Sequence, residues 1–161
     1  MQTRSKNGVT LPVLVLTVVV LIILMTVGVK EVGNIMEQVN LETIGTDLLI
    51  VQAKAKVIAE KSNFNSDEAL LKGQKISEIT GNERLQELKS KGIINEADAN
   101  YENYYLWDKE TVESLSIGIT EMEEDDFFIV NYETEEVIYP IGYQHSDGNT
   151  YYKLTEIVEL N

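Results

Sequence analysis

The sequence predicts an α+β protein in which a long N-terminal helix packs on a small antiparallel β-sheet accompanied by short helices. Three observations lead to this prediction. An apolar run without a charged residue extends from Val9 to Val29. Beyond Lys30, apolar residues recur every three or four positions, which is typical of one helical face. From Asp126 onward, β-rich runs alternate with polar turns. The apolar face of such a sheet needs cover, and the helix is its natural partner.

The run Val9–Val29 has the length of a single membrane-spanning helix. Its 21 residues would form a helix about 31 Å long, close to the ~30 Å hydrocarbon core of a bilayer. A cleaved secretory signal is the alternative, but its apolar region is shorter, about 7–15 residues, and residues 26–30 offer a poor cleavage site. Arg4 and Lys6 precede the run and no acidic residue does. We therefore expect a single-pass cell-membrane protein with a cytoplasmic N-terminus and an extracytoplasmic remainder.

The helix is predicted to continue past the membrane as an amphipathic segment over residues 30–61. Its apolar stripe comprises Leu41, Ile44, Leu48, Val51, Ala55 and Ile58. No proline interrupts the chain from Val13 to Lys61, so one helix of roughly 53 residues, about 80 Å long, can form. Two interpretations of its second half stay open: a membrane-proximal stalk or coiled coil, and a spine packed against the protein's own globular domain.

Residues 62–161 are expected to form an extracytoplasmic α+β domain. The predicted helical elements are a turn at 67–72, a helix at 82–92 capped by Asn82 and a helix at 108–115 capped by Asp108. Three strands are predicted, at 127–132, 136–143 and 150–155. Asp147-Gly148 lies in the turn before the last strand, where glycine tolerates a positive φ angle.

Composition excludes several classes of function. All 27 acidic residues but only 11 of the 13 Lys and Arg residues lie after Val29, so residues 30–161 carry a formal charge of −16. Such a domain repels nucleic acid, and direct DNA or RNA binding is not expected. The chain has no cysteine, which excludes disulfides, thiolate metal sites and cysteine nucleophiles.

The N-terminal pattern resembles that of the type IV pilin family, which includes the pseudopilins of type II secretion and competence systems. The stretch Gly8-Val9-Thr10-Leu11-Pro12-Val13 matches the family at the glycine, the Thr-Leu pair and the proline. Lys6 belongs to the basic leader before them. The resemblance implies that residues 1–8 are a leader, that prepilin peptidase cuts between Gly8 and Val9, and that Val9 becomes an N-terminus that can be methylated. It also implies assembly with other subunits and a dedicated machinery into a cell-surface filament.

Two positions depart from the family pattern. The first mature residue would be Val9 rather than phenylalanine, and Val13 replaces the family's glutamate. In the family, that glutamate is thought to pair with the N-terminal amine of a neighbouring subunit. A buried ammonium without a carboxylate partner is costly, so Val13 favours a minor, initiating or tip subunit over a repeated major one.

Three motifs are candidates for a catalytic, metal-binding or ligand-binding site. His145-Ser146-Asp147 holds the residue types of a hydrolase triad, but catalytic Ser, His and Asp converge from distant positions, so we expect a simple turn and no enzyme. Residues 121–126 are a dense acidic run, either a solvated loop or an adventitious Ca²⁺ site, although EF-hand spacing is absent. An aromatic cluster is expected to cover the core, with a ligand platform as the alternative: Tyr101, Tyr104, Tyr105 and Trp107.

The sequence thus predicts a non-enzymatic, cofactor-free pilin-like subunit in contact with membrane lipid. Its predicted parts are a leader (1–8), a membrane helix (9–29), the amphipathic continuation (30–61) and the globular domain (62–161). The alternative is an uncut, membrane-anchored ectodomain that acts alone as a sensor or binding module. Secretion, DNA uptake, adhesion and motility are not distinguished by these residues.

Overall fold

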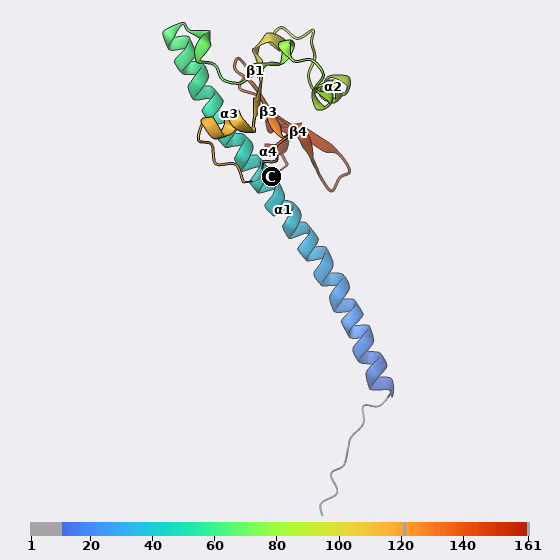
Figure 1. Ribbon diagram of the computed structural model, residues 1–161. Helices are drawn as coiled ribbons and strands as arrows, with labels where there is room; N and C mark the ends of the chain where they lie inside the picture. Colours follow the sequence, from blue (N-terminus) through green and yellow to red (C-terminus); the bar gives the residue numbers. More distant parts are fainter. Residues whose placement is uncertain (1–10, 121, 161) are drawn as a thin grey trace, which may run out of the picture. The chain divides into compact units, whose positions relative to one another are not determined.

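A computed structural model describes the backbone of residues 11–120 and 122–160 (Figure 1). It describes the side chains of Thr17, residues 38–120 and residues 122–160. Internal contacts divide the chain into two units, Met1–Val39 and Asn40–Asn161. The boundaries predicted at residues 8, 29 and 61 stay predictions. Among the described residues, no helix is both long and apolar enough to cross a membrane. Apart from Thr17, the side chains of the predicted membrane segment Val9–Val29 lie outside that description.

Helix α1 spans Leu11–Asn65 and is the long helix that the sequence predicts. It ends one turn later than Lys61. Ser66 adopts the left-handed conformation with φ 51°, and the backbone N–H of Asp67 donates to the carbonyl of Ser62 at 3.1 Å. A left-handed residue followed by this 6→1 hydrogen bond is the Schellman ending of an α-helix. Serine therefore occupies the left-handed position after the helix, where glycine is the usual residue.

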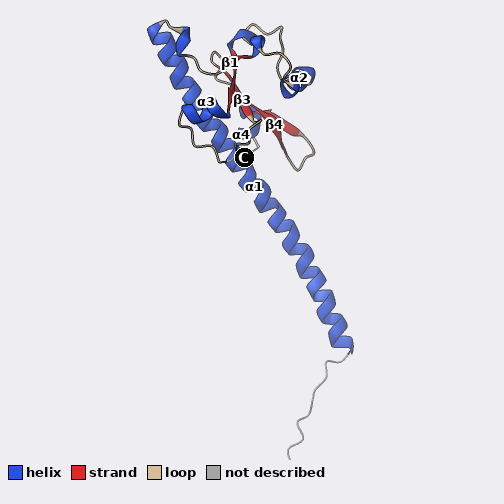
Figure 2. Cartoon of the chain, viewed as in Figure 1, coloured by secondary structure: helices blue, strands red, loops and turns tan. Residues whose placement is uncertain are grey.

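Within the described residues, five strands form one antiparallel sheet in sequence order (Figure 2). They are β1 (Gln74–Lys75), β2 (Tyr104–Asp108), β3 (Phe127–Asn131), β4 (Val137–Gln144) and β5 (Thr150–Lys153). The three predicted strands correspond to β3, β4 and β5. β1 and β2 were not predicted, since β1 is only two residues long and the aromatic run of β2 lacks alternation of polar and apolar residues. The last predicted strand stops at Lys153, where α4 (Leu154–Val158) begins.

The short helices flank the sheet and follow the predicted caps. α2 spans Glu83–Ser90, and the Asn82 side chain accepts a hydrogen bond from the Leu85 backbone N–H at 2.9 Å. α3 spans Lys109–Ser114, and Asp108 accepts from the Thr111 N–H at 2.9 Å. The predicted turn at 67–72 contains the 3₁₀ helix η1 (Glu68–Leu70); η2 (Ile76–Glu78) and η3 (Tyr101–Asn103) complete the set. Both N-caps are thus confirmed.

The sheet is buried on both faces, whereas the sequence suggested one apolar face. One core lies between α1 and the sheet and includes Leu48, Val51, Trp107 and Val130. A second core lies on the opposite face and includes Leu85, Leu88 and Ile129. Every residue of β3 is buried, because Phe127–Val130 is apolar at each position and so serves both faces. The spine interpretation of residues 40–61 is therefore the correct one for this domain.

Polar contacts fix α1 to the sheet beside its apolar face. The Gln52 amide donates to the backbone carbonyl of Glu135 at 2.8 Å, and the Lys56 ammonium lies 2.9 Å from the Glu135 carboxylate. Glu135 sits in the β3–β4 turn with a positive φ of 60°. The Asn131 side chain organises this turn by accepting from the backbone N–H groups of Glu133 and Thr134, each at 2.9 Å. The helix and this turn are thereby positioned together.

Candidate functional site

The structure describes only part of the predicted processing site. Lys6, Gly8, Val9 and Thr10 lie outside the described residues. Leu11, Pro12 and Val13 belong to α1 through their backbone, while their side chains are not described. Proline is compatible with the first turn of a helix, because the N–H that it lacks has no partner within the helix there. The site therefore stays a prediction from the sequence.

Helix α1 carries a second apolar face, directed away from its own sheet. We call Leu49, Ile50 and Val57 the outer stripe; they are 48%, 39% and 59% exposed. Ile50 and Val57 are seven residues apart, and the exposed Ala53 lies between them. This interval has the spacing of one heptad, the unit with which helices pack side by side. The buried face includes Leu48, Val51 and Ala55 on the other side of the helix.

A groove of about 500 Å³ opens beside the first turns of α1 within the domain. We call it the α1–β4 groove. It is bounded by α1, by the loop after α3 and by strands β3 and β4. Its lining residues are Asn40, Thr43, Ile44, Asp47, Ile119, Thr120, Phe128, Tyr139, Gly142, Tyr143 and Gln144.

The groove coincides with a break in the pairing of β4. β3 and β4 pair only at Ile129–Ile138 and Val130–Val137, and the β4–β5 register shifts between Ile138 and Tyr143. Pro140 lies in this interval and cannot donate a backbone hydrogen bond. Gly142 follows with φ 77°, and a Cβ atom there would lie 2.5 Å from the Thr150 methyl carbon. Only glycine permits the close approach that re-aims the end of β4.

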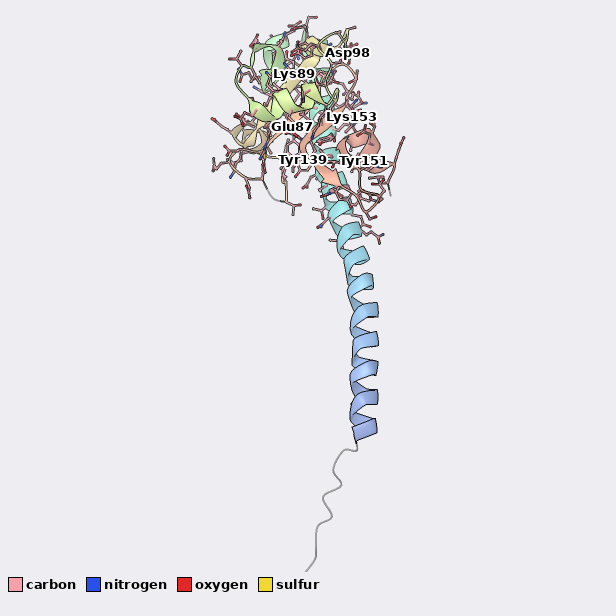
Figure 3. The ribbon with its side chains drawn as sticks, turned by 90° about the vertical axis from the view of Figure 1, so that its right-hand side faces the viewer. Glu87, Lys89, Asp98, Tyr139, Tyr151 and Lys153 are labelled. Atoms are coloured by element: carbon pink, nitrogen blue, oxygen red, sulfur yellow. The ribbon has the colours of Figure 1, made fainter. Side chains whose placement is uncertain are left out.

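The groove combines aromatic rings with one acidic group. The rings of Phe128 and Tyr139 stack with centroids 6.0 Å apart, and Tyr139 projects from β4 (Figure 3). Asp47 is the one charged residue among the described lining residues. Its carboxylate accepts hydrogen bonds from the Thr120 backbone N–H and hydroxyl, both at 3.3 Å. Burial raises the pKa of the Tyr139 phenol, and the nearby Asp126 and Asp47 raise it further. The electrostatics of the groove therefore favour a cationic or neutral occupant over an anionic one.

The His145-Ser146-Asp147 motif forms the turn between β4 and β5, as predicted. The His145 backbone N–H donates to the Asn149 carbonyl at 3.0 Å, and Gly148 has φ 87°. The Tyr151 hydroxyl donates to the Asp147 carboxylate at 2.6 Å, which is the main reason why the pKa of Asp147 is lowered to about 2. The Asn149 backbone N–H donates to the other Asp147 oxygen at 2.8 Å, and the His145 Nδ1 atom lies 3.4 Å from that same oxygen. The contacts of Asp147 are thus those of a hairpin turn.

The acidic run is divided among structural partners. Arg84 pairs with Asp126 at 2.9 Å, and Lys109 lies 3.3 Å from Glu124. Glu121 lies outside the described residues. Among the residues that are described, no group of three His, Cys, Asp or Glu side chains is arranged to hold a metal ion. The Ca²⁺ alternative receives no support from this geometry.

The aromatic cluster is core, not a ligand platform. Tyr101, Tyr104, Tyr105 and Trp107 are all buried. Tyr105 and Trp107 face α1, while Tyr101 and Tyr104 belong to the core on the other side of the sheet. The Trp107 indole N–H donates to the Lys72 carbonyl at 2.9 Å and contacts the Tyr132 hydroxyl at 3.2 Å. This satisfies the polar atom that burying a tryptophan brings into the core.

Comparisons with known proteins add no relative: no protein-family model, no curated protein and no solved structure matches the chain. The two features most suited to recognition, the outer stripe and the α1–β4 groove, were not predicted. The stripe left a signal in the seven-residue spacing of Ile50 and Val57. The groove left none, because its walls come from residues 40–47, 119–120, 128 and 139–144, which only the fold brings together.

Proposed function

We propose that the chain is a structural subunit of a type IV pilus-like or type II secretion or competence filament, made as a membrane-anchored precursor and cut after Gly8. The observation that carries the proposal is the outer stripe of α1. A helix that had only to support its own domain would need one apolar face. This helix has a covered face and an open one, and an open apolar stripe is suited to packing against the helix of another subunit.

The remaining observations are consistent with this proposal. The N-terminal pattern resembles a prepilin leader, and α1 runs without interruption from Leu11 to Asn65. In the filament, the N-terminal helix would exchange lipid contacts for helix–helix contacts. This exchange gains little from the hydrophobic effect, so specific contacts and an assembly machinery are required. Val13 in place of glutamate favours a minor or initiating subunit.

A second candidate function is a single-pass anchored binding domain that is never cut. The observation that favours it is the α1–β4 groove, since a concave site with aromatic walls and a few polar groups is typical of ligand binding.

Cleavage at Gly8 separates the two candidates. The full chain is extracted from membranes of cells with and without a prepilin peptidase, and its intact mass and N-terminal sequence are determined. We expect loss of Met1–Gly8 only when the peptidase is present, and a methyl group on Val9 would add further support. Gly8→Ala should block the cut, while Asn7→Ala, its matched neighbour, should leave it intact. A chain that stays uncut in both cells would favour the anchored binding domain.

A further inference from the structure

The C-terminal turn of α1 presents an apolar side chain that the domain leaves uncovered. Phe64 is 90% exposed, the largest exposed fraction among the large apolar side chains described. Lys61 is also exposed and lies three residues earlier, on the same helical face. Covering a phenylalanine ring removes a large apolar surface from water, which favours its burial in a contact. An exposed ring with a cation beside it, here called the Lys61–Phe64 end, is therefore a candidate contact.

The α1–β4 groove complements the Lys61–Phe64 end in two respects: it has aromatic walls and an acidic side chain. Phe128 and Tyr139 provide stacked rings against which a third ring can pack. Asp47 supplies a carboxylate, and no cation lies among the described lining residues. The groove volume of about 500 Å³ is that of a site for a sizeable group and not for a single water.

The two surfaces cannot meet within one chain. Asp47 and Phe64 lie on the same continuous helix, 17 residues apart in sequence, or about 26 Å along its axis. The end of one copy can therefore reach only the groove of another copy. Such a contact is heterologous, since different patches meet. A heterologous contact whose rotation does not close on itself builds an open helical filament.

We propose that the Lys61–Phe64 end of one copy docks into the α1–β4 groove of the next copy, with Phe64 against the Phe128 and Tyr139 rings and Lys61 beside Asp47. This proposal rests on the filament function proposed above. It predicts an axial offset of about 26 Å between the contacting copies. Thr43 lines the groove seven residues before Ile50, so the groove adjoins the line of the outer stripe. Helices that pack along their stripes with this offset would bring the two surfaces together.

The contact has a consequence for the place of the subunit. Val13 stands where the family has the carboxylate that joins neighbouring N-terminal segments, and so favours a minor, initiating or tip subunit. A head-to-tail contact between globular domains would join two copies without that carboxylate. If this contact forms, each copy has another copy as its neighbour in the filament. A single copy at the tip could not make the contact.

The absence of cysteine makes disulfide trapping a direct test, because engineered cysteines are the only ones in the chain. Two tagged forms of the full chain, one with Asn65→Cys and one with Ile119→Cys, are produced together in the cells that assemble the filament. Asn65 is exposed beside Phe64, so this cysteine leaves the docking ring in place. A second pairing uses Gln144→Cys, at the end of β4 in the lining of the groove. After mild oxidation, the sheared extracellular filament fraction is examined for the mixed disulfide. We expect it with both groove positions and not with the control Glu113→Cys, an exposed residue of α3 outside the groove.

Charge provides a matched control. Lys61→Glu should lower the yield of mixed disulfide at least several-fold, whereas Lys72→Glu, the same charge change at an exposed residue outside the groove, should not. A filament fraction that contains the chain but no disulfide between position 65 and the groove would overturn this proposal and leave the filament function intact. A chain that is never cut at Gly8 and never enters that fraction would overturn the proposed function itself.

Discussion

At the scale of single residues, Gly73 and Gly81 separate two effects of the same substitution. Both have positive φ, 88° and 81°, but only at Gly73 would a Cβ atom meet other atoms, 2.4 Å from the Leu106 carbonyl oxygen and 2.5 Å from the Trp107 ring. Gly81→Ala should cost about 1–2 kcal/mol from the left-handed backbone alone. Gly73→Ala should cost about 1–3 kcal/mol more, because the strand or the indole must shift. Denaturant unfolding measures both; equal losses would contradict the predicted clash.

Tyr132 gives a pH-dependent test of the packing around Trp107. Burial raises the pKa of its phenol to about 12 from 10.0. The folded state thus favours the neutral phenol, and this contribution to stability is complete below about pH 10 and is lost as the pH rises towards 12. Tyr132→Phe should be less stable at neutral pH, since it loses the 2.9 Å hydrogen bond to the Lys72 carbonyl. Its stability should fall less steeply between about pH 10 and pH 12. If the unfolding free energies of the unchanged protein and of Tyr132→Phe fall in parallel as the pH rises, this role of Tyr132 is contradicted.

At the scale of elements, the sequence predicted what local signals specify. The long helix, both side-chain N-caps at Asn82 and Asp108, and the Asp147-Gly148 turn each depend on residues within a few positions of one another, and all are present. β2 was missed because its aromatic residues serve two cores at once and so show no alternation. The groove was missed for a different reason. It depends on a register shift in β4, which is a property of strand pairing and not of composition.

The two faces of α1 make a matched pair of predictions. Leu48 is fully buried, and its neighbour Leu49 is 48% exposed on the outer stripe. Leu48→Ala should destabilise the domain by about 2–5 kcal/mol, because it leaves a cavity between helix and sheet. Leu49→Ala should change the unfolding free energy by no more than about 0.5 kcal/mol. If the outer stripe binds other subunits, Leu49→Ala should nevertheless reduce recovery in the filament fraction. A large loss of stability from Leu49→Ala would show that the stripe is not an open face.

At the scale of the whole molecule, the proposed assembly has to overcome the negative charge of residues 30–161. Residues 30–161 carry −16, so copies that approach one another repel over the range that salt allows. The Debye length falls from about 30 Å at 0.01 M to about 8 Å at 0.15 M salt. The contacts proposed here are mainly apolar, and the single Lys61–Asp47 attraction is small beside the summed repulsion. Added salt should therefore favour association, because it reduces the repulsion between copies by more than it reduces the Lys61–Asp47 attraction.

Sedimentation of the full chain in detergent measures how its self-association depends on salt concentration. Association should increase as salt is raised over this range, because long-range repulsion is screened first. Glu110→Gln with Glu113→Gln, which removes two exposed charges on α3 away from the groove lining, should shift the increase to lower salt. Lys61→Glu should shift it to higher salt and also lower the plateau, since the local pair is lost as well. Association that instead decreases from the lowest salt would mean that ion pairs, and not the outer stripe and Phe64, hold the copies together.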